Sequence, residues 1–189
     1  TMNIFVLHRS PKKAARMLCD RHAVKMILES VQMLCTAFVM IAPEDAVLNL
    51  SKKIKLYKPC HRNHPCTIWA RERKVNFIWL CMLASHIGKE YTYRYNKVHK
   101  SSKMVKPLYD AVMKLKKNES DFILDNSLND YKLVNFALAM PEDIRKNEVR
   151  AVPKQAVRMY REYYMTKLQN DWAVYKKGRT NPWKIILEK

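Results

Sequence analysis

The stretch that decides the fold class is residues 19–42, CDRHAVKMILESVQMLCTAFVMIA. It contains no glycine and no proline, and Pro43 follows it directly. Upstream, Ser10-Pro11 supplies a helix N-cap and a first-turn proline, so we predict an unbroken helix from there to Ala42. Apolar residues occupy most sides of this helix, and its polar residues are confined to one stripe.

The other elements are predicted from their boundaries. Asn63-His64-Pro65 begins a second helix that we expect to continue, with one kink, to about Tyr95. Further helices are predicted at 103–117 and 153–177. The segments between them are predicted as an extended start at 2–7, a basic loop at 44–60, a flexible polar segment at 118–130 and a short apolar segment at 136–140. We therefore expect a mainly α protein: one domain over 1–189, a bundle of four or five helices with a short extended N-terminus.

The composition agrees with a helical domain and excludes several other classes. With 189 residues, 48% of them hydrophobic, the chain can bury a core and is not a disordered basic tail. It has only two glycines, Gly88 and Gly178, where average usage would supply about 13. A Walker loop or a GxGxxG dinucleotide motif cannot be built from them.

The charge indicates a polyanionic partner. There are 36 Lys and Arg against 17 Asp and Glu, a formal net charge of +19. A field of this sign attracts polyanions, and we predict nucleic acid, specifically duplex DNA, as the partner. No apolar run approaches the roughly 18 residues of a spanning helix, and no signal peptide is recognised. The odd number of cysteines, five, is typical of reduced thiols, so we expect an intracellular protein that is neither secreted nor membrane-bound.

The polar stripe of residues 19–42 is the first candidate site. His22, Lys25, Glu29, Gln32 and Thr36 follow one another at spacings of 3, 4, 3 and 4, which places them on one side of the helix. The stripe is either the solvent face or the wall of a cleft. In a cleft, His22, Lys25 and Glu29 would supply a base, an amine and a carboxylate with shifted pKa values.

The segment 60–66, CHRNHPC, is the second candidate site. Adjacent Cys60 and His61 can hardly serve one tetrahedral zinc ion, so no metal is predicted here. The segment is either an ordinary cap and turn or a helix N-terminus whose amides face a phosphate. The residues assigned here to nucleic-acid binding are His61, Arg62, Asn63, His64, Trp69 and Arg71.

Tyrosines alternate with cations in 90–101, EYTYRYNKVHKS. Aromatic faces can stack on bases while cations hold phosphates. Alternating tyrosines on a helix cannot share one side, so at least one is expected in the core. From this segment and the last helix we assign to nucleic-acid binding Tyr91, Arg94, Lys97, His99, Lys100, Arg158 and Arg161. The basic turn at 176–184 is either a phosphate clamp or a docked tail.

Short motifs extend over most of the chain, except about 101–130. They include MNIFVL at 2–7, CDRH at 19–22, KMILE at 25–29, NHPC at 63–66, WARE at 69–72, EYTYRY at 90–95, AMPE at 139–142 and YREYY at 160–164. Together they resemble a family of small uncharacterised basic proteins of large DNA phages and viruses. The resemblance implies a viral or phage protein in the host cytoplasm and carries little function by itself.

The order of features is also similar to that of the pyrimidine-dimer DNA glycosylases with abasic-lyase activity. The corresponding positions are Thr1-Met2, His22, Glu29, His64-Pro65, Glu90, Arg94 and His99. The resemblance implies that a free N-terminal amine on Thr1 attacks C1′ of a damaged nucleotide and forms a Schiff base. It also implies that Glu29 stabilises the sugar cation and moves protons, without a cofactor. This chain is longer than those glycosylases, and if Met2 is the natural first residue, Lys25 is the alternative amine.

Other functions fit the same residues. A non-catalytic nucleic-acid-binding protein of a viral particle, or of a replication or transcription assembly, would need the cations but neither Glu29 nor Lys25. A metal-dependent nuclease would use His61, His64 and nearby carboxylates. Binding to an anionic membrane surface is a further alternative.

Overall fold

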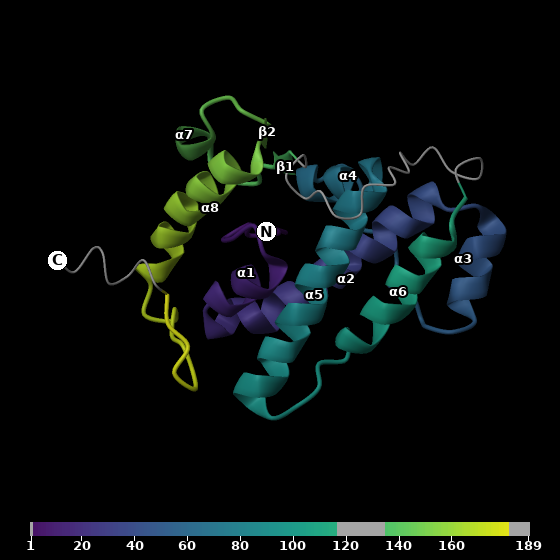
Figure 1. The fold of residues 1–189 in the computed structure, drawn as a ribbon, viewed down its shortest axis with the longest axis horizontal. Helices are drawn as coiled ribbons and strands as arrows, with labels where there is room; N and C mark the ends of the chain where they lie inside the picture. Colours follow the sequence, from purple (N-terminus) through teal and green to yellow (C-terminus); the bar gives the residue numbers. More distant parts are fainter. Residues whose placement is uncertain (1, 117–134, 182–189) are drawn as a thin grey trace.

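The computed structural model describes residues 2–116 and 135–181, and its fold is mainly α, as predicted (Figure 1). These residues form eight helices and one two-stranded sheet. The elements are α1 (Pro11–Met17), α2 (Asp20–Ile41), α3 (Glu44–Ser51), α4 (Pro65–Glu72), α5 (Lys74–Tyr95), α6 (Ser102–Lys114), β1 (Phe136–Ala137), α7 (Glu142–Arg145), β2 (Arg150–Ala151) and α8 (Pro153–Leu168). Helices α1, α2, α4, α5 and α6 pack against one another. The predicted count of four or five helices is too low, because two of the predicted helices are each broken in two and α3 and α7 were not predicted.

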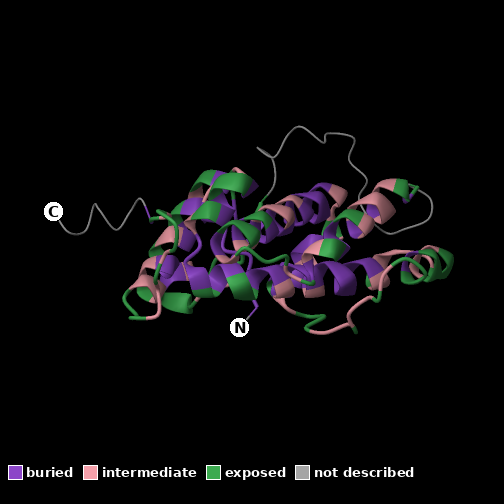
Figure 2. Ribbon diagram, turned by 90° about the horizontal axis from the view of Figure 1, so that it is seen from below, coloured by how far each residue is buried: buried purple, intermediate pink, exposed green. Residues whose placement is uncertain are grey.

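The two long helices, α2 and α5, form the centre of the core. The ring centroids of Phe38 on α2 and Phe77 on α5 are 6.4 Å apart. Buried residues run along the long helices, whereas exposed residues gather at the periphery (Figure 2). By length and composition alone, α2 is the one helix in the described part of the chain that could cross a membrane. However, 61% of its apolar window is buried in the fold, as in the core helix of a globular protein.

The predicted unbroken helix from residue 10 to 42 is wrong, because the chain leaves the helical conformation at Leu18 and Cys19. Both residues are extended, with ψ of 134° and 164°. Tertiary contacts satisfy the backbone groups freed by this break. The Leu18 carbonyl accepts from Arg94 Nη1 at 2.7 Å, and the Cys19 N–H donates to the Tyr164 hydroxyl at 2.8 Å.

The predicted kink in the second long helix is a full break at Arg73, which has φ −139° and ψ 142°. The side chain of Asn76 compensates by donating to the Trp69 carbonyl at 2.8 Å. The predicted loop at 44–60 is wrong over its first half, where α3 forms. Glu44 and Asp45 occupy the first turn of α3, where acidic side chains interact favourably with the helix dipole.

The start of the chain is extended and buried, as predicted. Residues 2–7 are all buried. Asn3 anchors them: its Nδ2 donates to the Ala139 carbonyl at 2.7 Å, and its Oδ1 accepts from the backbone N–H groups of Ile4 and Phe5. Phe5 has φ 35°, a conformation that a non-glycine residue adopts only under tertiary constraint. This extended segment, called the N-terminal strand below although it pairs with no sheet among the described residues, is therefore held firmly among the helices.

The last helix ends at Leu168, earlier than the predicted 177. The chain then runs along the start of α2, where the Asp20 N–H donates to the Val174 carbonyl at 2.9 Å. The Tyr175 hydroxyl donates to the Met17 carbonyl at 2.8 Å, and Lys176 N–H donates to Asp20 Oδ1 at 3.1 Å. The described part of the basic turn is thus a docked segment.

Two further features complete the fold. The predicted apolar segment at 136–140 contains β1, which pairs antiparallel with β2 so that Phe136 faces Ala151. Gly88 marks a close approach of α5 to α6, because a Cβ there would lie 2.5 Å from Ser102 Oγ. The predicted flexible segment at 118–130 lies outside the described residues.

Candidate functional site

Glu29 is a buried carboxylate on α2, with only 7% of the residue exposed. Its Oε1 lies 3.2 Å from Nζ of Lys25. Its Oε2 has no hydrogen-bond partner among the described residues. Burying a carboxylate oxygen without a partner costs free energy, and such groups in a native protein concentrate at functional sites.

The first described residues contact the N-terminal end of α4. The Met2 backbone is hydrogen-bonded to the ring of His64, and the Ile4 backbone to the thiol of Cys66. Burial raises the pKa of Cys66 to about 12, and the nearby negative charge of Glu29 contributes to the rise. Met2 and Ile4 are therefore held against the N-terminal end of α4. Thr1, the predicted nucleophile, lies outside the described residues.

His22 lies in an aromatic enclosure. Its ring stacks on Phe5 at 4.9 Å between centroids and meets the edge of Trp172 at 5.4 Å. Its Nδ1 is hydrogen-bonded to the Tyr164 hydroxyl at 2.8 Å. Burial, reinforced by the charges of nearby cations, lowers the pKa of His22 to about 4. The ring is therefore neutral near pH 7 and holds the N-terminal strand against α2.

The prediction that the polar stripe is a solvent face is wrong at three of the five positions of the stripe. His22, Glu29 and Thr36 are buried, whereas Lys25 is exposed and Gln32 is half-buried. The stripe lies at the edge of the core because the N-terminal strand and the chain around residue 60 cover it. The structure thus brings Lys25 and Glu29 together and leaves His22 in a supporting position.

We expect the stability of the fold to decrease on acidification because of His22. Its pKa is about 4 in the folded protein against 6.5 ordinarily, so below pH 6.5 the unfolded chain binds the proton more readily. The contribution is fully present above pH 6.5 and is lost as the pH falls towards 4, by up to about 3 kcal/mol. Urea unfolding from pH 7 to 4.5 measures it. The His22→Gln variant should show a flatter dependence, and identical slopes for both proteins would contradict the assignment.

The residues that precede α4 form an exposed turn. His61, Arg62 and Asn63 are exposed, and the Arg62 carbonyl accepts a hydrogen bond from Arg71. His64 caps α4 by accepting the Cys66 N–H at Nδ1, 3.1 Å away. Within residues 2–116 and 135–181, no three His, Cys, Asp or Glu side chains are grouped to hold a metal ion. Nucleic-acid binding by this turn stays a prediction.

The prediction that Trp69 binds nucleic acid is wrong, because its side chain lies in the core and has no exposed surface. The residue is 0% exposed. Its ring stacks on Phe136 at 5.4 Å and meets Trp79 edge-on at 6.0 Å, and its Nε1 donates to the Asn135 carbonyl. The indole therefore joins α4 to α5 and β1.

The prediction that Arg94 binds nucleic acid is also wrong, since its side chain is 0% exposed and its guanidinium is hydrogen-bonded within the protein. Its guanidinium lies 3.2 Å from Asp20 Oδ1 and 3.2 Å from Glu90 Oε2. It also donates to the carbonyls of Leu18 and Arg16. Arg94 therefore joins α5 to the α1–α2 break and is not free to bind phosphate.

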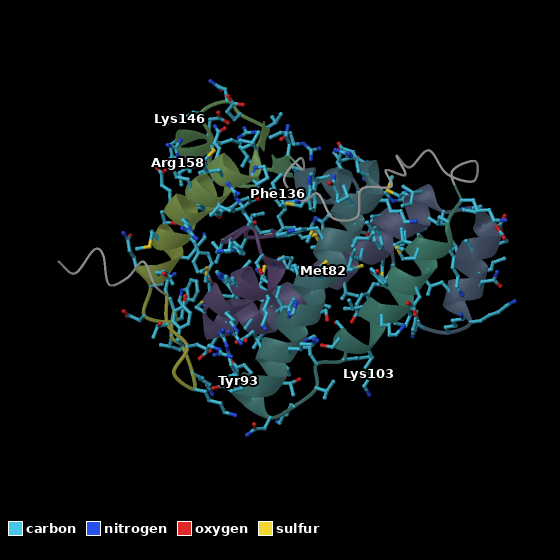
Figure 3. All side chains as sticks on the ribbon, in the orientation of Figure 1. Met82, Tyr93, Lys103, Phe136, Lys146 and Arg158 are labelled. Carbon is cyan, nitrogen blue, oxygen red and sulfur yellow. The ribbon has the colours of Figure 1, made fainter. Side chains whose placement is uncertain are left out.

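Glu90 also holds the docked C-terminal segment by binding Arg179, a contact that was not predicted from the sequence. Arg179 Nε lies 2.9 Å from Glu90 Oε2, and its Nη2 lies 3.0 Å from Oε1. Its guanidinium is 4.3 Å from the ring centroid of Tyr93, at the end of α5 (Figure 3). The two residues of this pair are too far apart in the sequence for any local pattern to predict the contact.

The remaining predicted binding residues lie at two surfaces. Near the end of α5, the Tyr91 ring contacts Tyr95 and His99, each at 5.0 Å. Lys97 and Lys100 are exposed beside them. These positions agree with a nucleic-acid surface, and their role stays a prediction.

The second surface is on α8. Arg158 extends outward (Figure 3), and Arg161 donates from Nε to the Leu7 carbonyl at 2.9 Å. Beside them lie three basic residues that the sequence did not single out: His8, Arg9 and Lys154. Their clustering depends on the packing of α8 beside the N-terminal strand, so no local pattern predicts it.

No protein-family model, curated protein or solved structure matches this chain significantly.

Proposed function

We propose that this protein excises damaged or modified pyrimidines from duplex DNA through an amine nucleophile. The observation that carries the proposal is Glu29, a buried carboxylate with one oxygen beside an amine and the other without a described partner. With only 7% of the residue exposed, Glu29 does not point into bulk water. The formal charge of +19 suits a DNA substrate.

The chemistry begins when the amine lone pair attacks C1′ of the nucleotide. The N–C1′ bond forms, and the glycosidic bond breaks with its electron pair leaving on the base, which takes up a proton. Opening of the sugar ring then gives an iminium ion, the Schiff base. Loss of a C2′ proton expels the 3′ phosphate, and hydrolysis returns the amine. Glu29 stabilises the positive charge at C1′ and relays these protons.

Two amines compete for the role of nucleophile. The α-amino group of a polypeptide titrates near pH 8, so a substantial fraction is neutral and nucleophilic under physiological conditions. An α-amine on Thr1 would be attached to Met2, whose backbone is hydrogen-bonded to His64. Lys25 is the second amine, with Nζ 3.2 Å from Glu29 Oε1.

Borohydride trapping tests the proposal and identifies the amine. Borohydride reduces the iminium ion to a stable secondary amine, so incubation with duplex DNA containing an abasic site should yield a covalent adduct. Mass spectrometry of the digested adduct should locate the modification at the N-terminal peptide, or at the Lys25 peptide under the alternative. Ultraviolet-irradiated duplex tests the pyrimidine lesion. The absence of an adduct on both substrates would overturn the amine mechanism.

A non-catalytic nucleic-acid-binding protein is the second candidate, favoured by the cations gathered beside α8. It predicts salt-sensitive binding to DNA or RNA that survives Glu29→Gln combined with Lys25→Ala. Under this candidate no trapped adduct forms.

A further inference from the structure

A cavity of about 650 Å³ lies between the end of the N-terminal strand and the first turns of α8. Its volume falls within the range of small-molecule binding sites. Five of the residues that line it are basic and none is acidic. The lining residues are His8, Arg9, Val152, Lys154, Gln155, Val157, Arg158 and Arg161. The cavity therefore combines positive charge with two apolar side chains.

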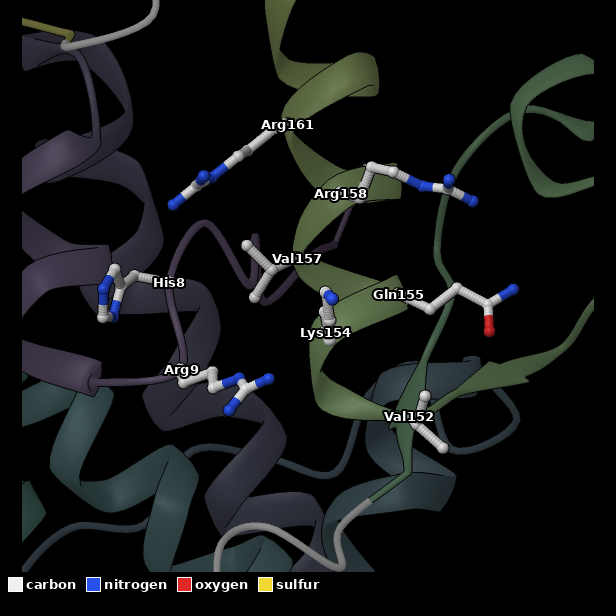
Figure 4. Close-up of a pocket in the computed structure, with 8 residues that line it drawn as sticks. All are labelled: His8, Arg9, Val152, Lys154, Gln155, Val157, Arg158 and Arg161. Atoms are coloured by element: carbon white, nitrogen blue, oxygen red, sulfur yellow. The ribbon is translucent and has the colours of Figure 1, made fainter.

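The side chains come from two segments that are distant in the sequence. In Figure 4, Arg161 extends from α8 towards His8, Arg9 lies below this gap, and Lys154 is drawn in front of α8. Arg158 and Gln155 extend from the other side of α8 in the same view. The basic groups thus surround the first turns of α8 from both sides.

Two of the basic groups are fixed in place before any ligand arrives. Arg161 Nε donates to the Leu7 carbonyl at 2.9 Å. The Nδ1 of His8 accepts the Ser10 N–H at 2.8 Å, which leaves Nε2 of the neutral ring to donate. Groups that are already oriented lose less entropy when they bind a ligand.

Three of the basic side chains of the cavity are not paired with carboxylates of the described residues. Arg9, Lys154 and Arg158 form no ion pair within residues 2–116 and 135–181. Burial lowers the pKa of His8, and the charges of Lys13, Arg161 and Arg9 lower it further. Like charges held this close repel one another, and an anion in the cavity would relieve the repulsion.

We propose that this cavity binds the phosphate groups of a nucleotide, at a site separate from Glu29. Arg9, Lys154 and Arg161 pair with the phosphate oxygens, since charge-assisted hydrogen bonds to phosphate are strong. Val152 and Val157 provide apolar contact for the sugar or base. The inference goes beyond the proposed base excision and does not depend on it. The nucleotide is either free or a unit of a polynucleotide strand.

Two probes distinguish these sources: magnesium-free ATP, titrated by calorimetry, and a fluorescent 16-base-pair duplex, followed by anisotropy. The test variant combines Arg9→Gln with Lys154→Gln. Both side chains are exposed and make no described hydrogen bond, so thermal unfolding should be unchanged. The matched control combines Lys55→Gln with Lys103→Gln, which removes the same charge from exposed positions elsewhere.

We expect the affinity of the cavity variant for at least one probe to fall about tenfold or more, because phosphate contacts are lost. The affinity of the control variant should change by less than about threefold. Loss of ATP binding indicates a free nucleotide, and loss restricted to the duplex indicates a strand phosphate. Equal weakening by both variants, or no weakening by either, overturns the inference. The cavity variant keeps Lys25 and Glu29, and the trapping experiment does not measure binding at this cavity, so failure here is distinguishable from failure of the trapping experiment.

Discussion

Replacing Glu29 by glutamine is expected to slow the formation of the borohydride-trapped adduct on abasic duplex DNA by about 10²–10⁴-fold, the usual contribution of a positioned acid–base group. Glutamine keeps the shape of the side chain but can neither carry the negative charge nor relay a proton. The rate of adduct formation under single-turnover conditions is the measurement. Duplex affinity should remain nearly unchanged, because the variant removes no cation.

The same substitution should leave the fold intact, which separates a chemical role from a structural one. Glu29 Oε2 has no described partner, and the Lys25 side chain of the ion pair is 48% exposed. A pair at this helical spacing contributes about 0.3–0.5 kcal/mol, and neutralising the buried Glu29 also removes the desolvation cost of its charge. The free energy of unfolding should therefore be unchanged or slightly higher in Glu29→Gln, as expected where a charge is retained at a cost to stability.

A matched control is Glu44→Gln, which neutralises an exposed carboxylate on α3. It should leave the trapping rate within about twofold, because an exposed carboxylate contributes little beyond its own surroundings. An unaltered trapping rate in Glu29→Gln would remove Glu29 from the mechanism. A loss of several kcal/mol of stability in that variant would instead show that the carboxylate is structural.

Local patterns in the sequence predicted the helices but not where they break. The polar stripe of α2 and the Asn63-His64-Pro65 helix start are each contained within their own segment of the sequence. The break at Leu18 and Cys19 depends on Arg94 and Tyr164, which are 76 and 145 residues away. No local window contains those partners, so the segment was predicted as continuous helix.

Local patterns in the sequence likewise predicted only part of the candidate site. Helical spacing placed Lys25 and Glu29 on one side of α2, and their 3.2 Å contact agrees. Spacing does not reveal which other elements cover that side, and so the burial of Glu29 could not be predicted. Trp69 was misassigned for a related reason: its basic neighbours suggested a nucleic-acid surface, but packing against Phe136 and Trp79 decides its burial.

The Arg94→Leu substitution is expected to reduce the free energy of unfolding by about 3–5 kcal/mol, the typical cost of removing one partner from a buried ion pair. Arg94 lies 3.2 Å from both Asp20 and Glu90, whose side chains are only 5% and 8% exposed. Leucine fills much of the volume but leaves two buried carboxylates without this cation. It also leaves the Leu18 and Arg16 carbonyls without a donor.

Urea unfolding at pH 7 measures this loss, and two further variants separate its causes. Arg94→Lys keeps the charge but cannot direct donors to four acceptors, so it should recover less than half of the loss. Arg179→Gln removes a partner of Glu90 that is more exposed than Arg94, with 24% of its side chain exposed, and should cost less than about 1 kcal/mol. If Arg94→Leu cost no more than Arg179→Gln, the buried cluster would not hold the α1–α2 break, and the break would have to be stabilised by Tyr164 and the docked segment alone.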